Sequence, residues 1–260
     1  MKKTLFILTL AITFIACKEQ PKNASSEQAA QEMKSERSNI NIDPIEHATM
    51  VLTWGDTTMY IDPVGGATAF EGKKAPDLIL ITDIHGDHLN VETLESIDTS
   101  GATIIVPQAV ADKLPEPMIE NVQILNNDEH SEQLGFDIEA IPMYNLREEA
   151  LKFHEKGRGN GYVISKNGFR VYISGDTEDI PEMRNLENVD YAFVCMNLPY
   201  TMPVDAAISA VLEFKPKKVF PYHYRGTKGY ADVARFISTV SFDGEIESEL
   251  LDWYPDKPIQ

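Results

Sequence analysis

The sequence predicts an α+β fold in which two packed β-sheets are flanked by helices. From residue 45 onward, short runs of apolar and β-branched residues alternate with helical segments, and the same style occurs in both halves of the chain. Two turn signals, Gly55-Asp56 and Asn167-Gly168, each join two such runs into a hairpin. With 260 residues, of which 43% are hydrophobic, the chain has enough material for a large core.

Each half is expected to contain several strands and two helices. In the first half we expect strands at 49–54, 57–62, 77–82, 102–106, 121–125 and 136–143, and helices at 90–97 and 108–114. In the second half we expect strands at 161–165, 169–174, 189–196 and 217–222, and helices at 204–214 and 230–240. Residues 136–143 alternate apolar and polar side chains, which is typical of a half-buried strand.

The N-terminal segment has the layout of a secretory signal. Lys2 and Lys3 precede an apolar run at residues 5–16 that is short for a membrane span, so residues 1–16 are expected to be a signal peptide. Residues 14–17, Phe-Ile-Ala-Cys, resemble the lipobox of bacterial lipoproteins, which implies cleavage before Cys17 and lipid on that cysteine. Ordinary signal cleavage and an uncleaved anchor are the alternatives.

Composition and net charge indicate the domain boundary, the location of the protein and one class of partner that is excluded. Residues 17–42 are polar with almost no apolar content and are expected to form a flexible tether, leaving a domain at 43–260. We expect a protein of the cell envelope, held to a membrane by lipid on Cys17 outside the cytoplasm. The formal net charge of −18 argues against a nucleic-acid partner, because phosphates would be repelled. Cys17 and Cys195 are not expected to form a disulfide.

The segment Asp83-Ile84-His85-Gly86-Asp87-His88 directly follows the apolar run at 77–82. Histidine and carboxylate side chains bind divalent cations such as zinc, and a buried cluster of them is costly unless a metal or a partner neutralises it. Two further loops, around Asp176 and around His223, also follow expected strands. The three loops together predict a metal site at one end of the sheets.

This set of motifs resembles the metallo-β-lactamase superfamily, whose hallmark is His-X-His-X-Asp-His followed by a later Asp and a late His. His47-Ala48-Thr49, Tyr60-Ile61-Asp62-Pro63, Gly175-Asp176-Thr177 and Pro221-Tyr222-His223-Tyr224 look like the branch that includes L-ascorbate-6-phosphate lactonase-like proteins. The resemblance covers roughly residues 45–251 and implies an αββα four-layer sandwich.

The resemblance also implies one or two divalent metal ions, zinc, manganese or iron. Their ligands would be Asp83 and His85 at the first metal, Asp87, His88 and His223 at the second, and Asp176 as the bridge. Two positions depart from the hallmark. Asp83 stands where the first histidine is usual, and no histidine follows the strand at 136–143, where the sequence is Met143-Tyr144-Asn145. Asn145 or His154 could supply the missing ligand, and oxygen-rich sites suit Mn²⁺ or Fe²⁺.

The implied activity is hydrolysis of an ester, lactone, amide or phosphodiester in a small-molecule substrate. A metal makes hydroxide available as a nucleophile near pH 7, and Asp87 would orient it and handle the proton. We expect Asp62 to orient a ligand histidine through a hydrogen bond. The residues expected to face the substrate are Asn145, His154, Tyr200 and Arg225. The alternative is a metal-containing, ligand-binding lipoprotein without turnover, favoured by the two missing histidines.

Overall fold

The computed structural model describes residues 28, 31–32, 34–37 and 39–255. The expected signal peptide at 1–16 and the expected lipidation site Cys17 lie outside the described residues. Among the helices that are described, none has the length and apolar character needed to cross a membrane.

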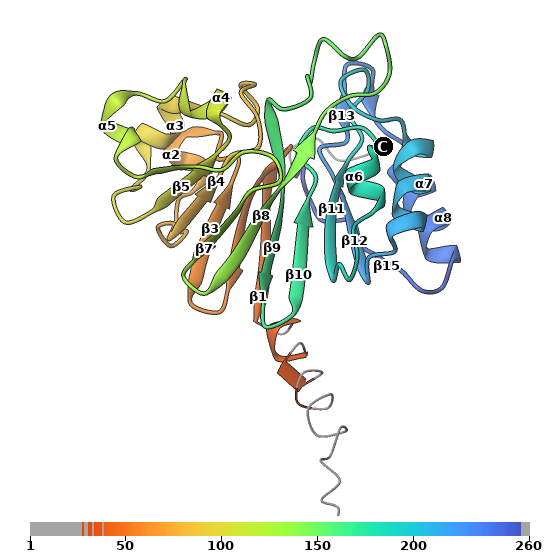
Figure 1. Ribbon diagram of the computed structural model, residues 1–260. Coiled ribbons are helices and arrows are strands. Elements are labelled where there is room, and N and C mark those ends of the chain that lie inside the picture. Colours follow the sequence, from red (N-terminus) through yellow and green to blue (C-terminus); the bar gives the residue numbers. More distant parts are fainter. Residues whose placement is uncertain (1–27, 29–30, 33, 38, 256–260) are drawn as a thin grey trace, which may run out of the picture.

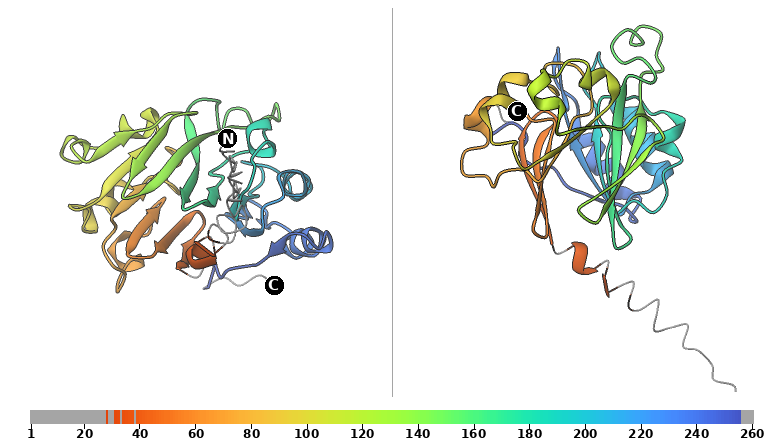
Figure 2. Two further views of the ribbon diagram at one scale, coloured as in Figure 1. Left: turned by 60° about the horizontal axis from the view of Figure 1, so that its bottom comes forward. Right: turned by 60° about the vertical axis from the view of Figure 1, so that its left-hand side comes forward.

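Two β-sheets pack face to face with helices on both outer faces, which confirms the predicted αββα four-layer sandwich (Figures 1 and 2). The strand order of the first sheet follows the chain; its strands are β1 (Ile40–Glu46), β2 (Thr49–Trp54), β3 (Thr57–Ile61), β4 (Leu78–Leu80), β5 (Thr103–Val106) and β6 (Val122–Ile124). The β1–β2 and β2–β3 pairs are antiparallel, whereas β3 to β6 run parallel.

The second sheet has the order β15-β12-β11-β10-β9-β8-β7. Its strands are β7 (His130–Gln133), β8 (Phe136–Met143), β9 (Gly159–Lys166), β10 (Phe169–Ile173), β11 (Tyr191–Cys195), β12 (Lys218–Tyr222) and β15 (Glu247–Ser248). From β7 to β10 the pairing is antiparallel, and from β10 through β11 and β12 to β15 it is parallel. A small hairpin, β13 (Arg225–Gly226) with β14 (Gly229–Tyr230), follows β12.

Short helices connect the parallel strands and cover the outer faces (Figure 1). On the first sheet they are α2 (Gly66–Ala69), α3 (Val91–Ser96), α4 (Gln108–Ala111) and α5 (Glu116–Ile119); on the second they are α6 (Pro181–Arg184), α7 (Val204–Phe214) and α8 (Val233–Phe242). The helix expected at 230–240 begins later, at Val233. The Asp232 side chain accepts a hydrogen bond from the Arg235 amide and caps it there, while Tyr230 pairs in β14.

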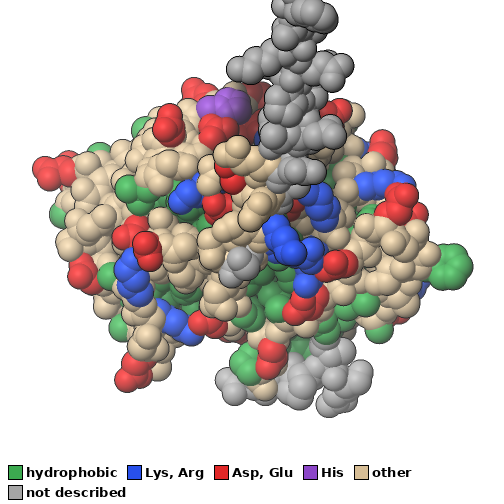
Figure 3. All heavy atoms as spheres, turned by 90° about the horizontal axis from the view of Figure 1, so that it is seen from below, with side chains coloured by type: hydrophobic (Ala, Val, Ile, Leu, Met, Phe, Trp, Pro, Cys, Tyr) green, Lys and Arg blue, Asp and Glu red, His purple; other side chains and the backbone are tan. Residues whose placement is uncertain are grey.

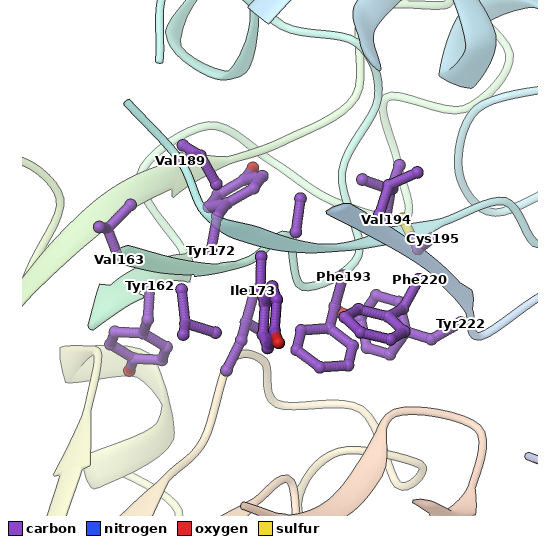
Figure 4. Close-up of a cluster of buried hydrophobic side chains, with 14 of the residues drawn as sticks. Tyr162, Val163, Tyr172, Ile173, Val189, Phe193, Val194, Cys195, Phe220 and Tyr222 are labelled. Atoms are coloured by element: carbon purple, nitrogen blue, oxygen red, sulfur yellow. The ribbon is translucent and has the colours of Figure 1, made fainter. Parts of the chain in front are cut away.

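The core follows the two-residue period of the strands. In β2, Met50, Leu52 and Trp54 belong to the large cluster between the sheets, whereas Val51 packs under the helices of the first sheet. The second sheet behaves likewise: Figure 4 shows Phe193 on one face of the strands and Val194 on the other. Both faces of both sheets are therefore buried, which is why the strands read as nearly continuous apolar runs.

The ordered domain begins earlier in the chain than the expected boundary at residue 43. Strand β1 starts at Ile40, inside the segment expected to be a flexible tether. Glu36 is buried, and its carboxylate accepts hydrogen bonds from the Trp54 indole at 2.6 Å and from the Asn167 amide at 2.7 Å. The polar composition of residues 17–42 did not indicate this contact, because only one glutamate of the segment, Glu36, makes it.

The topology brings several loops to one end of the sandwich. Parallel strands in one sheet end at the same edge, so the segments after β10, β11 and β12 emerge together, and the segment after β4 in the first sheet meets them where His88 lies 3.5 Å from Asp176. The long segment between β8 and β9 projects from this same end, at the top of Figure 1. Strand β1 starts at the opposite end.

Candidate metal centre

Four segments far apart in sequence meet at this end and form two adjacent clusters of potential metal ligands. One cluster contains Asp83, His85 and His154; the other contains Asp87, His88 and His223. Within each cluster the potential ligand atoms all lie within 4.8 Å of one another. The structure thus brings together all six residues expected to bind metal, with Asp176 between the clusters, and adds His154.

Asp83 is the centre of the first cluster and is fully buried. Its Oδ2 lies 2.6 Å from Nδ1 of His85 and 3.8 Å from Nε2 of His154. His154, one of the two residues expected as a replacement for the histidine missing after β8, lies in this cluster. It comes eleven residues beyond Met143, from the β8–β9 segment.

The second cluster is built around His223 and His88. Nε2 of His223 lies 3.3 Å from Oδ2 of Asp87, and Nε2 of His88 lies 3.9 Å from Oδ1 of Asp87. His223 has φ of 45°, a left-handed conformation that is costly for a residue with a Cβ. This turn directs the imidazole inward directly after β12.

Asp176 lies between the clusters and contacts both. Its Oδ2 is 3.4 Å from Nε2 of His154 and 3.5 Å from Nε2 of His88, while its Oδ1 is 3.4 Å from Nε2 of His223. This is the arrangement expected of a carboxylate that bridges two metal ions.

The unpartnered polar atoms of this region fit a metal site. Nε2 of His88, of His154 and of His223 and Oδ1 of Asp176 are buried without a hydrogen-bond partner among the described residues. Such atoms are costly in a protein interior unless something neutralises them. For metal–ligand bonds of about 2.0–2.2 Å, neighbouring donor atoms lie roughly 3.0–3.6 Å apart. Most of the separations across Asp176 and His223 fall in this range.

His88 is oriented by Asp62, as expected. Oδ2 of Asp62 lies 2.8 Å from Nδ1 of His88, which leaves Nε2 directed at Asp176. Asp62 is itself held because its carboxylate accepts hydrogen bonds from the Thr82 amide and hydroxyl, both at 2.7 Å. Contacts of this kind fix the tautomer and the ring orientation of a metal-binding histidine.

His154 is held by Asn145 and by the segment around Tyr200. Nδ1 of His154 lies 3.1 Å from the Tyr200 carbonyl, and the Asn145 side-chain amide donates to that same carbonyl at 2.6 Å. In the tautomer that donates from Nδ1 to this carbonyl, Nε2 presents its lone pair to Asp176. Asn145 is buried, its side-chain amide lies 3.2 Å from Nδ1 of His154, and it is not among the residues that line the two pockets beside the clusters, so its expected contact with a substrate stays a prediction.

The electrostatics of the centre favour ionised carboxylates. Burial opposes the charge on Asp176, but His223 and His88 hold the pKa of that carboxyl well below its usual range. Burial likewise opposes protonation of His88, yet Asp176 and Asp62 raise the pKa of its imidazole well above the usual value. In the protein without metal, a proton on His88 therefore carries positive charge that a cation would otherwise supply.

The loop that carries Asp176 requires glycine at position 175. Gly175 has φ of 60°, and a Cβ there would lie 2.6 Å from the Met143 sulfur and 3.0 Å from the Asn160 carbonyl oxygen. The tight turn brings the Asp176 amide to 3.0 Å from the same sulfur. Close packing against β8 and β9 thus positions the carboxylate.

Two pockets open on either side of Asp87. One, of about 290 Å³, is lined by His85, His154, Asp87 and Asp176 and by Tyr200, Phe153 and Asn197. The other, of about 340 Å³, is lined by Asp87, His47, Glu46 and small or apolar residues of β1, β2 and the segment around α2. Tyr200 therefore lies where a substrate contact was expected.

Arg225 is not among the residues that line these two pockets. Its guanidinium pairs with Glu46 at 3.0 Å, contacts Nε2 of His47 and lies 5.0 Å from the centre of the Tyr254 ring. Burial, together with His223 and Arg225, lowers the pKa of His47 to about 3, so His47 is a neutral acceptor for this arginine. The contacts that the structure shows for Arg225 are therefore with the protein, and its expected role toward a substrate stays a prediction.

Arg158 is a residue at this centre that the sequence did not reveal. Its Nε and Nη2 donate to the two oxygens of Asp83, at 3.1 and 3.0 Å. The signal that could have found it is Asp83 itself, because a buried carboxylate requires a cationic or hydrogen-bonding partner.

Two adjacent ligand clusters, joined by a carboxylate at the strand ends of an αββα sandwich, define a metal-dependent hydrolase of the metallo-β-lactamase fold. Residues 41–223 match the Beta-lactamase superfamily domain, and the chain belongs to this family.

Known relatives agree with this class. A UPF0173 metal-dependent hydrolase from Thermococcus onnurineus is 31% identical over 178 residues, which cover 65% of this chain and 78% of the relative. A crystal structure of a candidate metal-dependent hydrolase from Parabacteroides distasonis has a TM-score of 0.74 and 32% identity, covering 83% of this chain and 94% of that one. Igni18, a metallo hydrolase from Ignicoccus hospitalis, shares the fold with a TM-score of 0.69 and 22% identity, over 82% of this chain and 94% of that chain.

Proposed function

We propose that this metal-dependent hydrolase uses a dinuclear centre to cleave an ester or lactone bond in an uncharged, partly apolar small molecule. The observation that carries the proposal is the convergence of three unpartnered imidazole nitrogens on Asp176. Asp83, His85 and His154 would hold one ion, Asp87, His88 and His223 the other, and Asp176 would bridge them. Bound divalent ions lower the pKa of water and polarise a carbonyl oxygen.

Asp87 is the proposed proton carrier. Its side chain is 43% exposed, compared with 4% for Asp176, and it lines both pockets. Its carboxylate would accept the proton of the water that attacks the carbonyl carbon and would deliver a proton to the alkoxide released when the C–O bond breaks. The nearby His223 and His88 hold the pKa of Asp87 below its usual value even though burial opposes this, so the carboxylate is ionised near neutral pH.

The pocket walls favour an uncharged substrate over a phosphodiester. Among the described residues that line the two pockets there is no lysine or arginine. An anionic substrate is usually recognised by such side chains. Phe153 and Tyr200, which pack edge-on against each other, line the pocket of about 290 Å³, and the segments that carry them also hold Leu146, Leu151 and Leu198, each more than 40% exposed. The branch resemblance to lactonase-like proteins adds lactones to the candidates.

For the metals, we propose Mn²⁺ or Fe²⁺ with zinc as the competitor, because each site has two carboxylates once the bridging Asp176 is counted. The binding-protein alternative relied on two missing histidines, and the presence of His154 in the first cluster supports the enzyme over that alternative.

We further propose that Cys17 carries lipid and anchors the chain in the cell envelope. Support comes from the lipobox-like sequence and from topology, since β1 starts at the end opposite to the metal centre. At that end, seen from below in Figure 3, acidic and basic side chains are interspersed. An anchored molecule would present its site to solvent, which suits a soluble substrate.

Substrate class is tested by comparing p-nitrophenyl esters and aliphatic lactones of increasing chain length with bis(p-nitrophenyl) phosphate, using Mn²⁺-loaded or Zn²⁺-loaded protein. We expect kcat/KM to rise with chain length and the phosphodiester to react most slowly. Leu198→Ser should reduce the dependence on chain length, whereas Leu134→Ser, at an exposed turn of the second sheet, should not. A preference for the phosphodiester would contradict the proposed substrate class.

A further inference from the structure

Asp83 is held by a bidentate ion pair that is unusual for a metal ligand. Nε of Arg158 donates to Oδ1 at 3.1 Å and Nη2 donates to Oδ2 at 3.0 Å, while the Asp83 side chain is completely buried. Nη2 also donates to the Phe153 carbonyl at 2.6 Å. Arg158 therefore ties Asp83 to the segment that carries His154, and both parts of the first cluster depend on one guanidinium.

The ion pair with Arg158 leaves one further lone pair on each oxygen of the Asp83 carboxylate. Each carboxylate oxygen has two lone pairs, and a bidentate guanidinium occupies one on each. Oδ2 also lies 2.6 Å from Nδ1 of His85 and faces Nε2 of His154 at 3.8 Å. The second lone pair of Oδ2 therefore points at these two histidines, and a cation bound among them would replace the contact between Asp83 and His85.

The positive charge of Arg158 offsets the negative charge that Asp83 brings in place of a neutral histidine. Asp83, Asp87 and Asp176 bring three negative charges to the two clusters, and Arg158 returns one positive charge. The net value of −2 is the one that a neutral histidine at position 83 would produce without an arginine. Without Arg158, the third carboxylate would be uncompensated. It would bind one cation more tightly, but it would also change the net charge of the two-metal centre that a substrate meets.

We propose that Asp83 and Arg158 act as one unit, a charge-compensated ligand that takes the place of a neutral histidine at the first metal. This rests on the proposed dinuclear centre. Arg158 is a positioning residue: it touches neither metal nor substrate, and it acts through the orientation and effective charge of Asp83 and through the segment that carries His154.

The test is calorimetric titration of the metal-free full chain with Mn²⁺ and, separately, Zn²⁺. Four variants are compared with the wild type: Arg158→Gln, Asp83→His, the double variant, and Arg184→Gln. Arg184 is the matched control because it is similarly buried, at 20% exposure against 18%, and pairs with Asp179 and Glu213, neither of which belongs to either cluster. Thermal melts of the metal-free proteins show which variants are folded.

We expect Arg158→Gln to bind the first metal about 10–100-fold more weakly, in line with the loss of other groups that orient ligands. The second metal, held by His88 and His223, should be retained and thus shows that the protein is folded. Asp83→His alone should be at least as defective, because it leaves Arg158 unpaired beside a cation. The double variant should recover first-site affinity to within about threefold of the wild type, with zinc now preferred over manganese.

The inference is overturned if Arg158→Gln binds both metals as the wild type does, or if Asp83→His binds them equally well with and without Arg158. A wild type that binds one metal or none would refute the dinuclear centre itself and the inference with it. These results differ from failure of the pair alone, in which the wild type binds two metals and the double variant shows no recovery.

Discussion

Nδ1 of His88 lies 2.8 Å from Oδ2 of Asp62, and both side chains are completely buried. This contact determines which nitrogen of His88 faces Asp176. We therefore expect Asp62→Asn to weaken metal binding at the second cluster about 10–100-fold. The control is Asp137→Asn, which alters another His–Asp pair, with His130, that is more than half exposed at the sheet surface. Metal affinity measured by competition with a chelator should be unchanged in the control, and an unchanged affinity in Asp62→Asn would contradict the orienting role.

Two glycines beside the proposed ligand residues should differ sharply in how well they tolerate substitution by alanine. Gly175→Ala places a Cβ at φ of 60° against the Met143 sulfur and the Asn160 carbonyl, so we expect about 2 kcal/mol or more of lost stability and displacement of Asp176. Gly86 lies between His85 and Asp87, where a Cβ would meet no atom within 4 Å, so Gly86→Ala should retain both stability and metal content. Equal effects in denaturant unfolding would show that the packing of the 175 turn does not position the carboxylate.

A hydroxyl joins the two sheets just below the centre. Tyr162 in β9 donates to the Ile81 carbonyl at 2.9 Å, at the end of β4. Tyr162→Phe should lower the free energy of unfolding by about 1–3 kcal/mol, because a buried acceptor loses its donor. Tyr172 is equally buried, but its hydroxyl has no hydrogen-bond partner among the described residues. Tyr172→Phe should therefore be neutral or stabilising in the same urea experiment, and the reverse order would refute this assignment.

The thiol of Cys195 should be inert in the folded protein. Burial raises its pKa to about 12, and Asp176 adds to the shift. In a Cys17→Ser chain, a disulfide reagent at pH 8 should react only after denaturation; rapid reaction in the native state would contradict the burial. Between about pH 9 and 12 the folded state keeps a proton that the unfolded chain releases, so this group makes stability fall as pH rises through that window.

Local signals in the sequence predicted most of the framework. The 49–54 and 57–62 hairpin around Gly55-Asp56 is present as β2 and β3, and the helix at 204–214 is present as α7 with the same limits. These elements follow from turn chemistry and periodicity, which act over a few residues. Strand β1 was not predicted because it directly follows a polar segment that hides the strand pattern. What defines it is its pairing with β2, which the local sequence does not show.

The centre was predictable where its ligands follow strands, as for Asp83 to His88, Asp176 and His223. The β8–β9 segment was not, because a loop's path is set by distant contacts. His154 was one of two options for the missing ligand, and the hydrogen bonds of Asn145 and His154 to the Tyr200 carbonyl, together with the position of His154 in the first cluster, favour His154. Arg158 could not be assigned to Asp83 across 75 residues of sequence.

The most direct test of the dinuclear centre is elemental analysis of the full chain purified with Mn²⁺, Fe²⁺ or Zn²⁺ supplied. His88→Ala, Asp176→Ala and the exposed His130→Ala control should be analysed alongside. We expect about two divalent ions per chain in the wild type and in the His130 variant. When His88 or Asp176 is removed, the second site should be largely empty, so the total should fall below two ions per chain. A wild type that binds no metal under any supply, or the same metal content in all four proteins, would contradict the metal centre proposed for these clusters.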